Sequence, residues 1–104
     1  MRDPRAILDD CTGFEWDEGN AEKNLVSHGV TQTEAEQVFF NVPLLLAPDP
    51  EHSQTEDRYY GLGVTNTGRS LFVVFTVRGK LVRIISARDM SRRERWAYEQ
   101  AKKG

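Results

Sequence analysis

The chain has 104 residues, enough for one domain with one hydrophobic core and too few for two. Hydrophobic residues make up 38% and charged residues 29%, which excludes a disordered chain. The longest apolar runs, near 42–47 and 71–77, are far shorter than the ~20 residues of a membrane helix, and no secretory signal opens the chain. We therefore expect a cytoplasmic protein without membrane contact. Its one cysteine, Cys11, excludes an internal disulfide framework, and we expect no metal and no cofactor.

The net charge of −2 hides a strong asymmetry along the chain. Residues 1–57 carry three basic and thirteen acidic side chains, a balance of −10, whereas residues 58–104 carry eleven basic and three acidic ones, a balance of +8. Such halves predict a dipolar surface whose positive side attracts phosphates. The alternative is that the two halves neutralise each other across the fold.

The first half of the chain predicts an arm, a strand and two helices. Residues 1–12 form an N-terminal arm, as an ordered strand or a loose segment, before a single domain at 13–104. A short strand at 13–16 is followed by a helix with Asp17 as N-cap and Gly29 just past its end. Thr31 and Glu34 match a capping box that opens a second helix, which stops before Pro43.

The second half predicts four strands and a final helix. The strands cover about 43–49, 58–65, 70–77 and 81–87, with a polar loop at 51–57, a turn at 66–69 and a tight hairpin at 78–80. Ser91 and Glu94 form a capping box that opens the last helix. The order β-α-α-β-β-β-β-α, with short turns between strands, predicts an α+β fold in which helices pack mainly on one face of an antiparallel sheet.

Four segments, taken in order, resemble the BrnT family of bacterial toxin proteins: FEWDEGNAEKNLVSHGV, AEQVFF, DPEHSQTEDRYYGLG and RIISARDMSRRERWAYE. The resemblance runs from about Phe14 to Tyr98 and implies a RelE-like α+β fold and a ribonuclease toxin of a type II toxin–antitoxin system. It also implies a small DNA-binding antitoxin similar to BrnA. One departure is Asn20, where many relatives have a lysine; if that lysine touches RNA, its role here is either lost or taken by Lys23.

Cleavage of RNA by its own 2′-hydroxyl requires a base, an acid and positive charge that stabilises the phosphorane. Residues 83–95 hold half of the chain's arginines. Guanidinium groups suit phosphate because their donors form a planar, permanently charged fork. Arg83 and Arg88 point to opposite faces of a regular strand, unless the chain bends near Ala87. With Arg58, they would form a three-arginine cradle; the alternative for Arg88 is an anchor that holds an acidic residue such as Asp17.

The last helix offers further contacts to RNA. Arg92, Arg93 and Arg95 are candidate backbone contacts, or else a solvated helix face on which Arg95 pairs with Glu99. Trp96 and Tyr98 are able to stack on bases, although we expect Trp96 to pack the helix onto the sheet.

Two histidines, His28 and His52, fall on regions that nothing in the sequence brings together. His28 ends the first helix, where the helix dipole favours its protonated form, so it is a candidate acid alongside Tyr98 or a phosphate contact. The alternative is that it only caps the helix. His52, in a polar loop, is a weaker candidate, and the capping box already accounts for Glu94.

The leading hypothesis is a metal-independent endoribonuclease toxin that arrests growth, with Arg58, Arg83, Arg88, His28 and Tyr98 as catalytic residues. Its partners would be RNA and a BrnA-like ribbon-helix-helix antitoxin, with which it could form a higher-order complex. It would bind operator DNA only through this antitoxin. The alternatives are a non-catalytic basic interaction module and a degenerate toxin that acts only in operon autoregulation.

Overall fold

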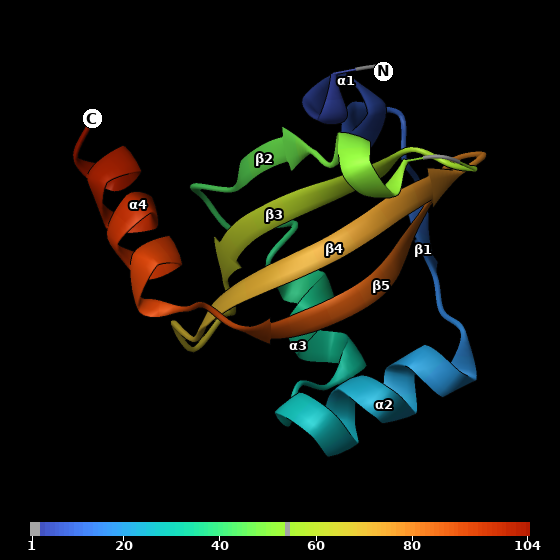
Figure 1. Cartoon of the computed structure of the whole chain (residues 1–104), viewed down its shortest axis with the longest axis horizontal. Helices are drawn as coiled ribbons and strands as arrows, with labels where there is room; N and C mark the ends of the chain where they lie inside the picture. The colour runs from blue at the N-terminus through green and yellow to red at the C-terminus, as the bar shows by residue number, and fades with distance from the viewer. Residues whose placement is uncertain (1–2, 54) are drawn as a thin grey trace.

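The computed structural model describes residues 3–53 and 55–104; the first two residues of the expected arm and Gln54 of the polar loop lie outside this range. A five-stranded sheet in the order β1-β5-β4-β3-β2 forms the centre of the molecule (Figure 1). The strands are β1 (Gly13–Glu15), β2 (Leu45–Pro48), β3 (Arg58–Val64), β4 (Ser70–Arg78) and β5 (Leu81–Asp89). The α+β class and the predicted order of strands are confirmed.

The sheet is mixed, which corrects the prediction of a purely antiparallel one. β2 to β5 are antiparallel neighbours joined through β3 and β4, but β1 pairs parallel with β5, so that Gly13 lies opposite Leu81 and Glu15 opposite Arg83. Two parallel neighbouring strands require a long connection between them. Here β1 and β5 are connected by two helices, α2 and α3, and by the three strands β2, β3 and β4. No single turn signal in the sequence marks this pairing.

The helices are α1 (Pro4–Asp9), α2 (Glu18–His28), α3 (Gln32–Gln37) and α4 (Arg92–Lys103), and a short 3₁₀ turn, η1, spans Pro50–His52. The described part of the expected arm is neither a strand nor loose, because α1 is helical and buries Ile7 in the core. The predicted N-cap of α2, its left-handed Gly29 terminus and the capping box of α3 are confirmed. Among the described residues no helix is long and apolar enough to cross a bilayer.

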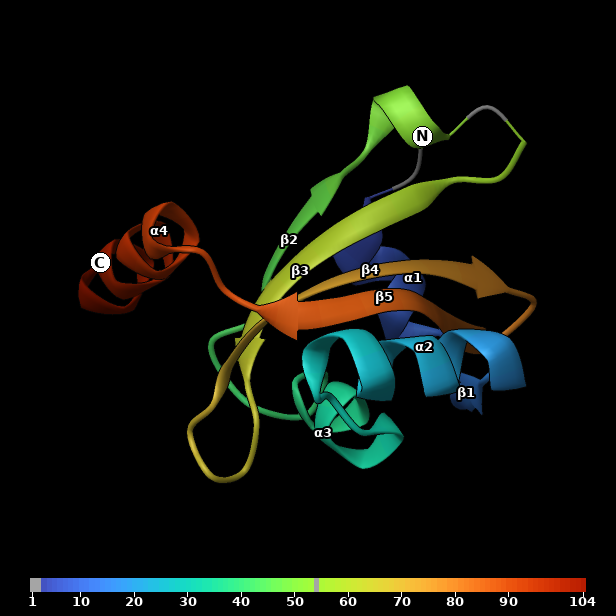
Figure 2. The same cartoon turned by 60° about the horizontal axis from the view of Figure 1, so that its bottom comes forward.

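The hydrophobic core lies between the sheet and helices α1 to α3. Alternate residues of β3, β4 and β5 are buried on this side, and Val30, Ala35 and Val38 cover them from the α2–α3 region. Figure 2 shows α2 and α3 on one side of β4 and β5, with α4 beyond the end of the sheet. The prediction that helices pack mainly on one face is therefore confirmed.

α4 is attached to the rest of the domain through Tyr98 rather than Trp96. Tyr98 is 1% exposed and its hydroxyl donates a hydrogen bond to the carbonyl of Pro43, whereas Trp96 is 66% exposed. The expectation that Trp96 packs the helix onto the sheet is wrong. The capping box predicted for Ser91 and Glu94 is confirmed.

Candidate functional site

The face of the sheet opposite the core, which we call the open face, carries the side chains that alternate with the buried ones. Arg58 lies opposite Thr76, and Thr76 lies opposite Arg83, so two arginines flank one threonine across three strands. Neighbouring strands are about 4.8 Å apart, which separates the backbones of Arg58 and Arg83 by roughly 10 Å. Toward the other end of the face, Arg88 lies opposite Phe72.

A bulge in β5 brings Arg83 and Arg88 to the same face. The pairing of β4 with β5 shifts between Val74 and Phe75, because Val74 lies opposite Ser86 and Phe75 opposite Ile84. Ile85 is the extra residue, and an extra residue reverses the alternation beyond it. The expectation of opposite faces thus holds only for a regular strand, and the irregularity lies at Ile85 rather than near Ala87.

Arg83 joins the last strand to the beginning of α2. Its guanidinium lies 3.2 Å from Asp17 Oδ2 and 3.6 Å from Glu15 Oε1, and its side chain is only 16% exposed. The other oxygen of Asp17 accepts the backbone N–H of Gly19 at 2.8 Å as the cap of α2. The role of holding Asp17, which we considered for Arg88, therefore belongs to Arg83.

Arg88 forms a two-point ion pair with Glu94. Two of its nitrogens lie 2.8 and 2.9 Å from the carboxylate oxygens, and the guanidinium lies 4.2 Å from the centre of the Phe72 ring. This hydrogen bonding raises the pKa of Arg88 and lowers that of Glu94. Glu94 also accepts the backbone N–H of Ser91, so Arg88 secures the beginning of α4.

Arg58 differs from both. Among residues 3–53 and 55–104 no carboxylate lies within ion-pair distance of its guanidinium, and its Nε is buried without a hydrogen-bond partner. The expectation of three unpaired guanidinium groups is thus met at Arg58 alone. The charge of Arg58 therefore has no counter-ion within the described chain, and an anion that met the guanidinium would supply one.

Arg58 lines a hollow of about 330 Å³ on the open face. The other lining residues come from η1, from the residue just before it and from strands β3 to β5: Asp49, His52, Tyr60, Phe72, Val74, Ile85 and Ser86. Tyr60 and Phe72, whose ring centres are 5.3 Å apart, also line an adjoining hollow that reaches Glu94 of α4. Within the part of the chain that the structure describes, the open face therefore offers Arg58 as a cation without an ion-pair partner, beside a pair of aromatic rings.

His52 enters this hollow from η1, with its Nδ1 2.9 Å from Asp49 Oδ2. The histidine side chain is 60% exposed and the aspartate 4%. Desolvation opposes ionisation of Asp49, but hydrogen bonding from Tyr60 and His52 outweighs it, and the pKa of Asp49 is lowered. We underrated His52 from the sequence; the signal was its spacing of three from Asp49 in a turn that begins at Pro50.

Several predicted site residues lie elsewhere. His28 and Lys23 are exposed on α2, on the opposite side of the sheet from the hollow. Tyr98 lines neither hollow of the open face, and its buried hydroxyl already has a partner. These positions do not support the proton-transfer roles expected for His28 and Tyr98.

The three arginines of α4 are exposed, in agreement with either interpretation offered for them. Arg92, Arg93 and Arg95 have no ion pair within the described chain, and Glu99 lies 3.8 Å from Lys102 instead of pairing with Arg95. They extend the positive surface beyond the end of the sheet.

Arg69, which the sequence predicts only as part of a turn, connects that turn to β5, to α3 and to the end of α2. It contacts Asp89 at 2.7 Å and Glu34 at 3.1 Å, and it donates to the carbonyls of His28 and Gly29 at the end of α2. Its role is structural, since one guanidinium binds two carboxylates and two carbonyls from separate segments of the chain.

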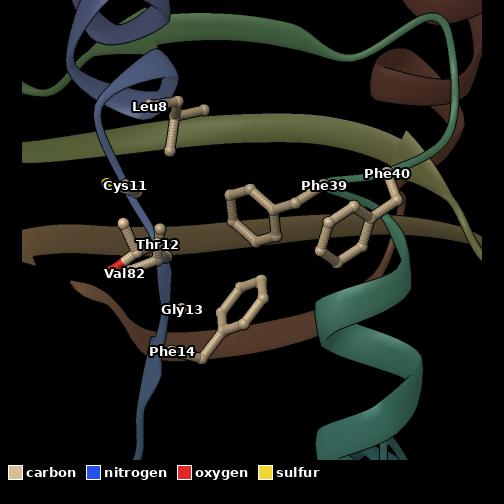
Figure 3. A pocket seen from close by; sticks show the side chains of 8 residues that line it. All are labelled: Leu8, Cys11, Thr12, Gly13, Phe14, Phe39, Phe40 and Val82. Carbon is tan, nitrogen blue, oxygen red and sulfur yellow. The ribbon is translucent and has the colours of Figure 1, made fainter. Parts of the chain in front are cut away.

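Another hollow, of about 200 Å³, lies where α1, β1 and the end of α3 meet (Figure 3). Figure 3 shows the rings of Phe14, Phe39 and Phe40 gathered on one side of it. Burial, and then the charge of Asp10, raise the pKa of the Cys11 thiol at its margin, which disfavours a thiolate nucleophile. No lining side chain is charged, so this hollow is a poor phosphate site.

Comparison with known proteins bears on the whole domain. No curated protein matches the sequence. The fold is similar to that of the Brucella abortus ribonuclease toxin BrnT, known from a 1.1 Å crystal structure, with a TM-score of 0.60 and 23% identity over 78% of this chain and 99% of that one. Residues 16–94 match the family described as the ribonuclease toxin, BrnT, of type II toxin–antitoxin systems. Since this match covers most of the sequence, the chain belongs to the BrnT family of type II toxin–antitoxin ribonuclease toxins.

Proposed function

We propose that this protein is an endoribonuclease that cleaves RNA on the open face of its sheet without a metal ion, and so arrests growth until an antitoxin binds it. The observation that carries the proposal is Arg58, a guanidinium that lines a hollow and lacks a carboxylate partner in the described chain. A fixed cation in a partly dry site stabilises the charge that develops on phosphorus oxygens during cleavage.

The surroundings of Arg58 fit single-stranded RNA. Tyr60 and Phe72 present aromatic surface beside the cation, and base stacking on such rings is sequence-tolerant. Arg83 and Arg88 hold the flanking helices in place, while the exposed arginines of α4 contact the RNA backbone.

The test is cleavage of single-stranded RNA by purified Arg58→Ala protein, with Arg58→Lys as the charge-preserving variant. Removal of one transition-state donor lowers the rate by roughly 100-fold or more. Lysine restores part of the rate, because it keeps the charge but loses the fork. Lys80→Gln, which removes one positive charge on the other side of the sheet, is the control and keeps the wild-type rate. Arg58→Ala protein that is folded and fully active would overturn the proposal.

Metal independence has its own measurement. We expect the wild-type rate to persist after dialysis against EDTA, because the proposed stabilising charge belongs to the chain itself. A rate abolished by the chelator and restored by a divalent cation would contradict this part of the proposal.

We further propose that the antitoxin is a BrnA-like ribbon-helix-helix protein that covers the positive surface with acidic residues. In this arrangement the toxin reaches operator DNA only through the antitoxin, in a complex that contains more than one copy of each chain. The measurement is binding of operator DNA by the toxin, the antitoxin and the mixture. Operator binding by the toxin alone would contradict it.

One observation favours a second candidate, a non-catalytic or degenerate toxin that serves autoregulation. Both Arg83 and Arg88 are engaged by the chain's own carboxylates, so neither guanidinium is free to hold a phosphate. A wild-type protein that binds its antitoxin but leaves RNA intact, both free and in a translating extract, would establish this candidate instead.

A further inference from the structure

The carboxyl end of β2 and the η1 turn fix a histidine against a buried carboxylate. Asp49 is held on several sides: its backbone N–H donates to the carbonyl of Arg58 at 2.9 Å, and its own carbonyl accepts the hydroxyl of Ser53 at 2.6 Å. The carboxylate of Asp49 is hydrogen-bonded to Nδ1 of His52. The histidine ring therefore has a defined orientation, although most of it is exposed. Such a pair is built before any ligand arrives.

The pair also sets which ring nitrogen carries the hydrogen. Hydrogen bonding keeps the pKa of Asp49 low, against the opposing effect of desolvation, so the ionised carboxylate accepts a hydrogen bond from Nδ1–H. In the neutral ring, Nε2 then has a free lone pair and is the nitrogen able to take a proton. A carboxylate in this position orients the imidazole without itself becoming protonated.

His52, Asp49 and Arg58 line the same hollow. The base and the free cation are thus presented to one ligand from η1 and from the beginning of β3. His28, exposed on α2, has no comparable setting, since the hollow is on the other side of the sheet.

We propose that His52, oriented by Asp49, is the general base that removes the proton from the RNA 2′-hydroxyl whose neighbouring phosphate lies on Arg58. This rests on the proposed ribonuclease function and adds to it the base that the arginines do not supply. Asp49 is a positioning residue, because it acts only through His52.

The reaction is a transesterification that needs no further reactant. As O2′ bonds to phosphorus, its proton passes to Nε2 of His52, and the bond from phosphorus to O5′ breaks. The leaving O5′ takes a proton from water, and His52 later returns its proton to solvent. The products are one strand that ends in a 2′,3′-cyclic phosphate and another that begins with a 5′-hydroxyl.

The experiment measures single-turnover cleavage of single-stranded RNA, with DNA of the same sequence as the uncleaved control. His52→Ala lowers the rate by roughly 100-fold or more, the usual contribution of a general base. Added imidazole restores part of the rate to His52→Ala but none to Arg58→Ala, a result that a purely structural histidine would not give. Glu51→Gln, an exposed neighbour in the same turn outside the lining of the hollow, keeps the wild-type rate.

Asp49 is tested through its dependence on His52. Asp49→Asn lowers the rate when His52 is present and changes it little in the His52→Ala background, because a positioning residue has no effect without the group it orients. Equal effects in both backgrounds would remove Asp49 from the proposal. If Asp49→Asn fails to fold, the exposed His52 and the imidazole experiment still decide.

The outcomes separate the two proposals. Active wild-type protein together with a His52→Ala rate within threefold of it would overturn the His52 assignment and leave the ribonuclease function standing. Wild-type protein that cleaves no RNA, free or in a translating extract, would overturn both. Products that end in a linear 3′-phosphate from the earliest times would contradict attack by the 2′-hydroxyl.

Discussion

At the scale of single residues, the surroundings of each arginine decide its role. Arg83 and Arg88 meet carboxylates supplied by neighbouring helix starts, while Arg58, on the same face, meets none in the described chain. A guanidinium bonded to a carboxylate has already used the fork that a phosphate would occupy. The unpaired arginine is therefore the one to expect at the reacting phosphate.

Arg69 gives a prediction about stability. Arg69→Gln removes bonds to two carboxylates and two helix-end carbonyls, and we expect the free energy of unfolding to fall by about 2 kcal/mol. Arg78→Gln is the matched control, because Arg78 is half-exposed and its ion-pair partner among the described residues is Glu56 alone; its loss should cost no more than about 0.5 kcal/mol. Urea unfolding of the three proteins measures both. Equal losses in the two variants would contradict the structural role of Arg69.

Glu94 gives a prediction about pH. Its pKa lies below the ordinary 4.5, first because of hydrogen bonding from Arg88, so protons bind it more weakly in the folded state. The resulting stability is present above pH 4.5 and is lost as pH falls through the lowered folded value. Arg88→Gln protein should therefore lose less stability than the wild type between pH 5 and pH 3. Parallel stability curves for the two proteins would contradict this coupling.

At the scale of elements, α4 depends on few contacts. Its buried residue is Tyr98, and Arg88 together with the capping box fixes its first turn. We expect Tyr98→Ala to lower the free energy of unfolding by about 4 kcal/mol and Tyr98→Phe by about 1 kcal/mol, since only the hydroxyl is lost. Trp96→Ala, on the exposed side, should change it by less than about 0.5 kcal/mol. Calorimetry checks the three values, and a larger effect at Trp96 than at Tyr98 would reverse the assignment.

The elements also show what the sequence could and could not predict. Capping residues announced three of the helices, because an N-cap acts on atoms two or three residues away. α1 was not predicted as a helix, because it is short and is stabilised by the packing of Ile7 into the core. The parallel pairing of β1 depends on contacts between distant parts of the chain, which local patterns do not encode.

In the candidate site, too, local features could be predicted from the sequence and contacts between distant residues could not. Arg58 was predicted from residue type and position, but the engagement of Arg83 was not, because its partner Asp17 lies 66 positions away in the chain. His52 was within reach of prediction, since Asp49 is a near neighbour in sequence, yet the burial of that aspartate is a tertiary property.

At the scale of the whole molecule, the acidic and basic halves partly neutralise each other. Arg83, Arg69 and Arg78 each pair with a carboxylate from the first half. What remains positive is concentrated at Arg58 and along α4. Neutralisation across the fold thus accounts for these three arginines, while attraction of phosphate by the remaining positive surface stays a prediction.

This distribution predicts the salt dependence of RNA binding. For an uncleavable 2′-O-methyl oligonucleotide, replacing Arg92, Arg93 and Arg95 together by glutamine should reduce the slope of log affinity against log salt by about 2, roughly 0.7 for each lost phosphate contact. Lys80→Gln should leave the slope unchanged. Fluorescence anisotropy across a salt series measures it, and an unaltered slope in the triple variant would place the RNA backbone away from α4.

The extra residue at Ile85 makes the spacing of the two arginines in β5 informative in its own right. Five positions separate Arg83 from Arg88, which is an odd interval. In a strand without a bulge, two residues at an odd interval point to opposite faces. A related toxin that keeps both cations on one side with an interval of four or six has no need of the insertion. The number of residues between two such arginines therefore predicts, from sequence alone, which homologues have a bulge in the last strand and which have a regular one.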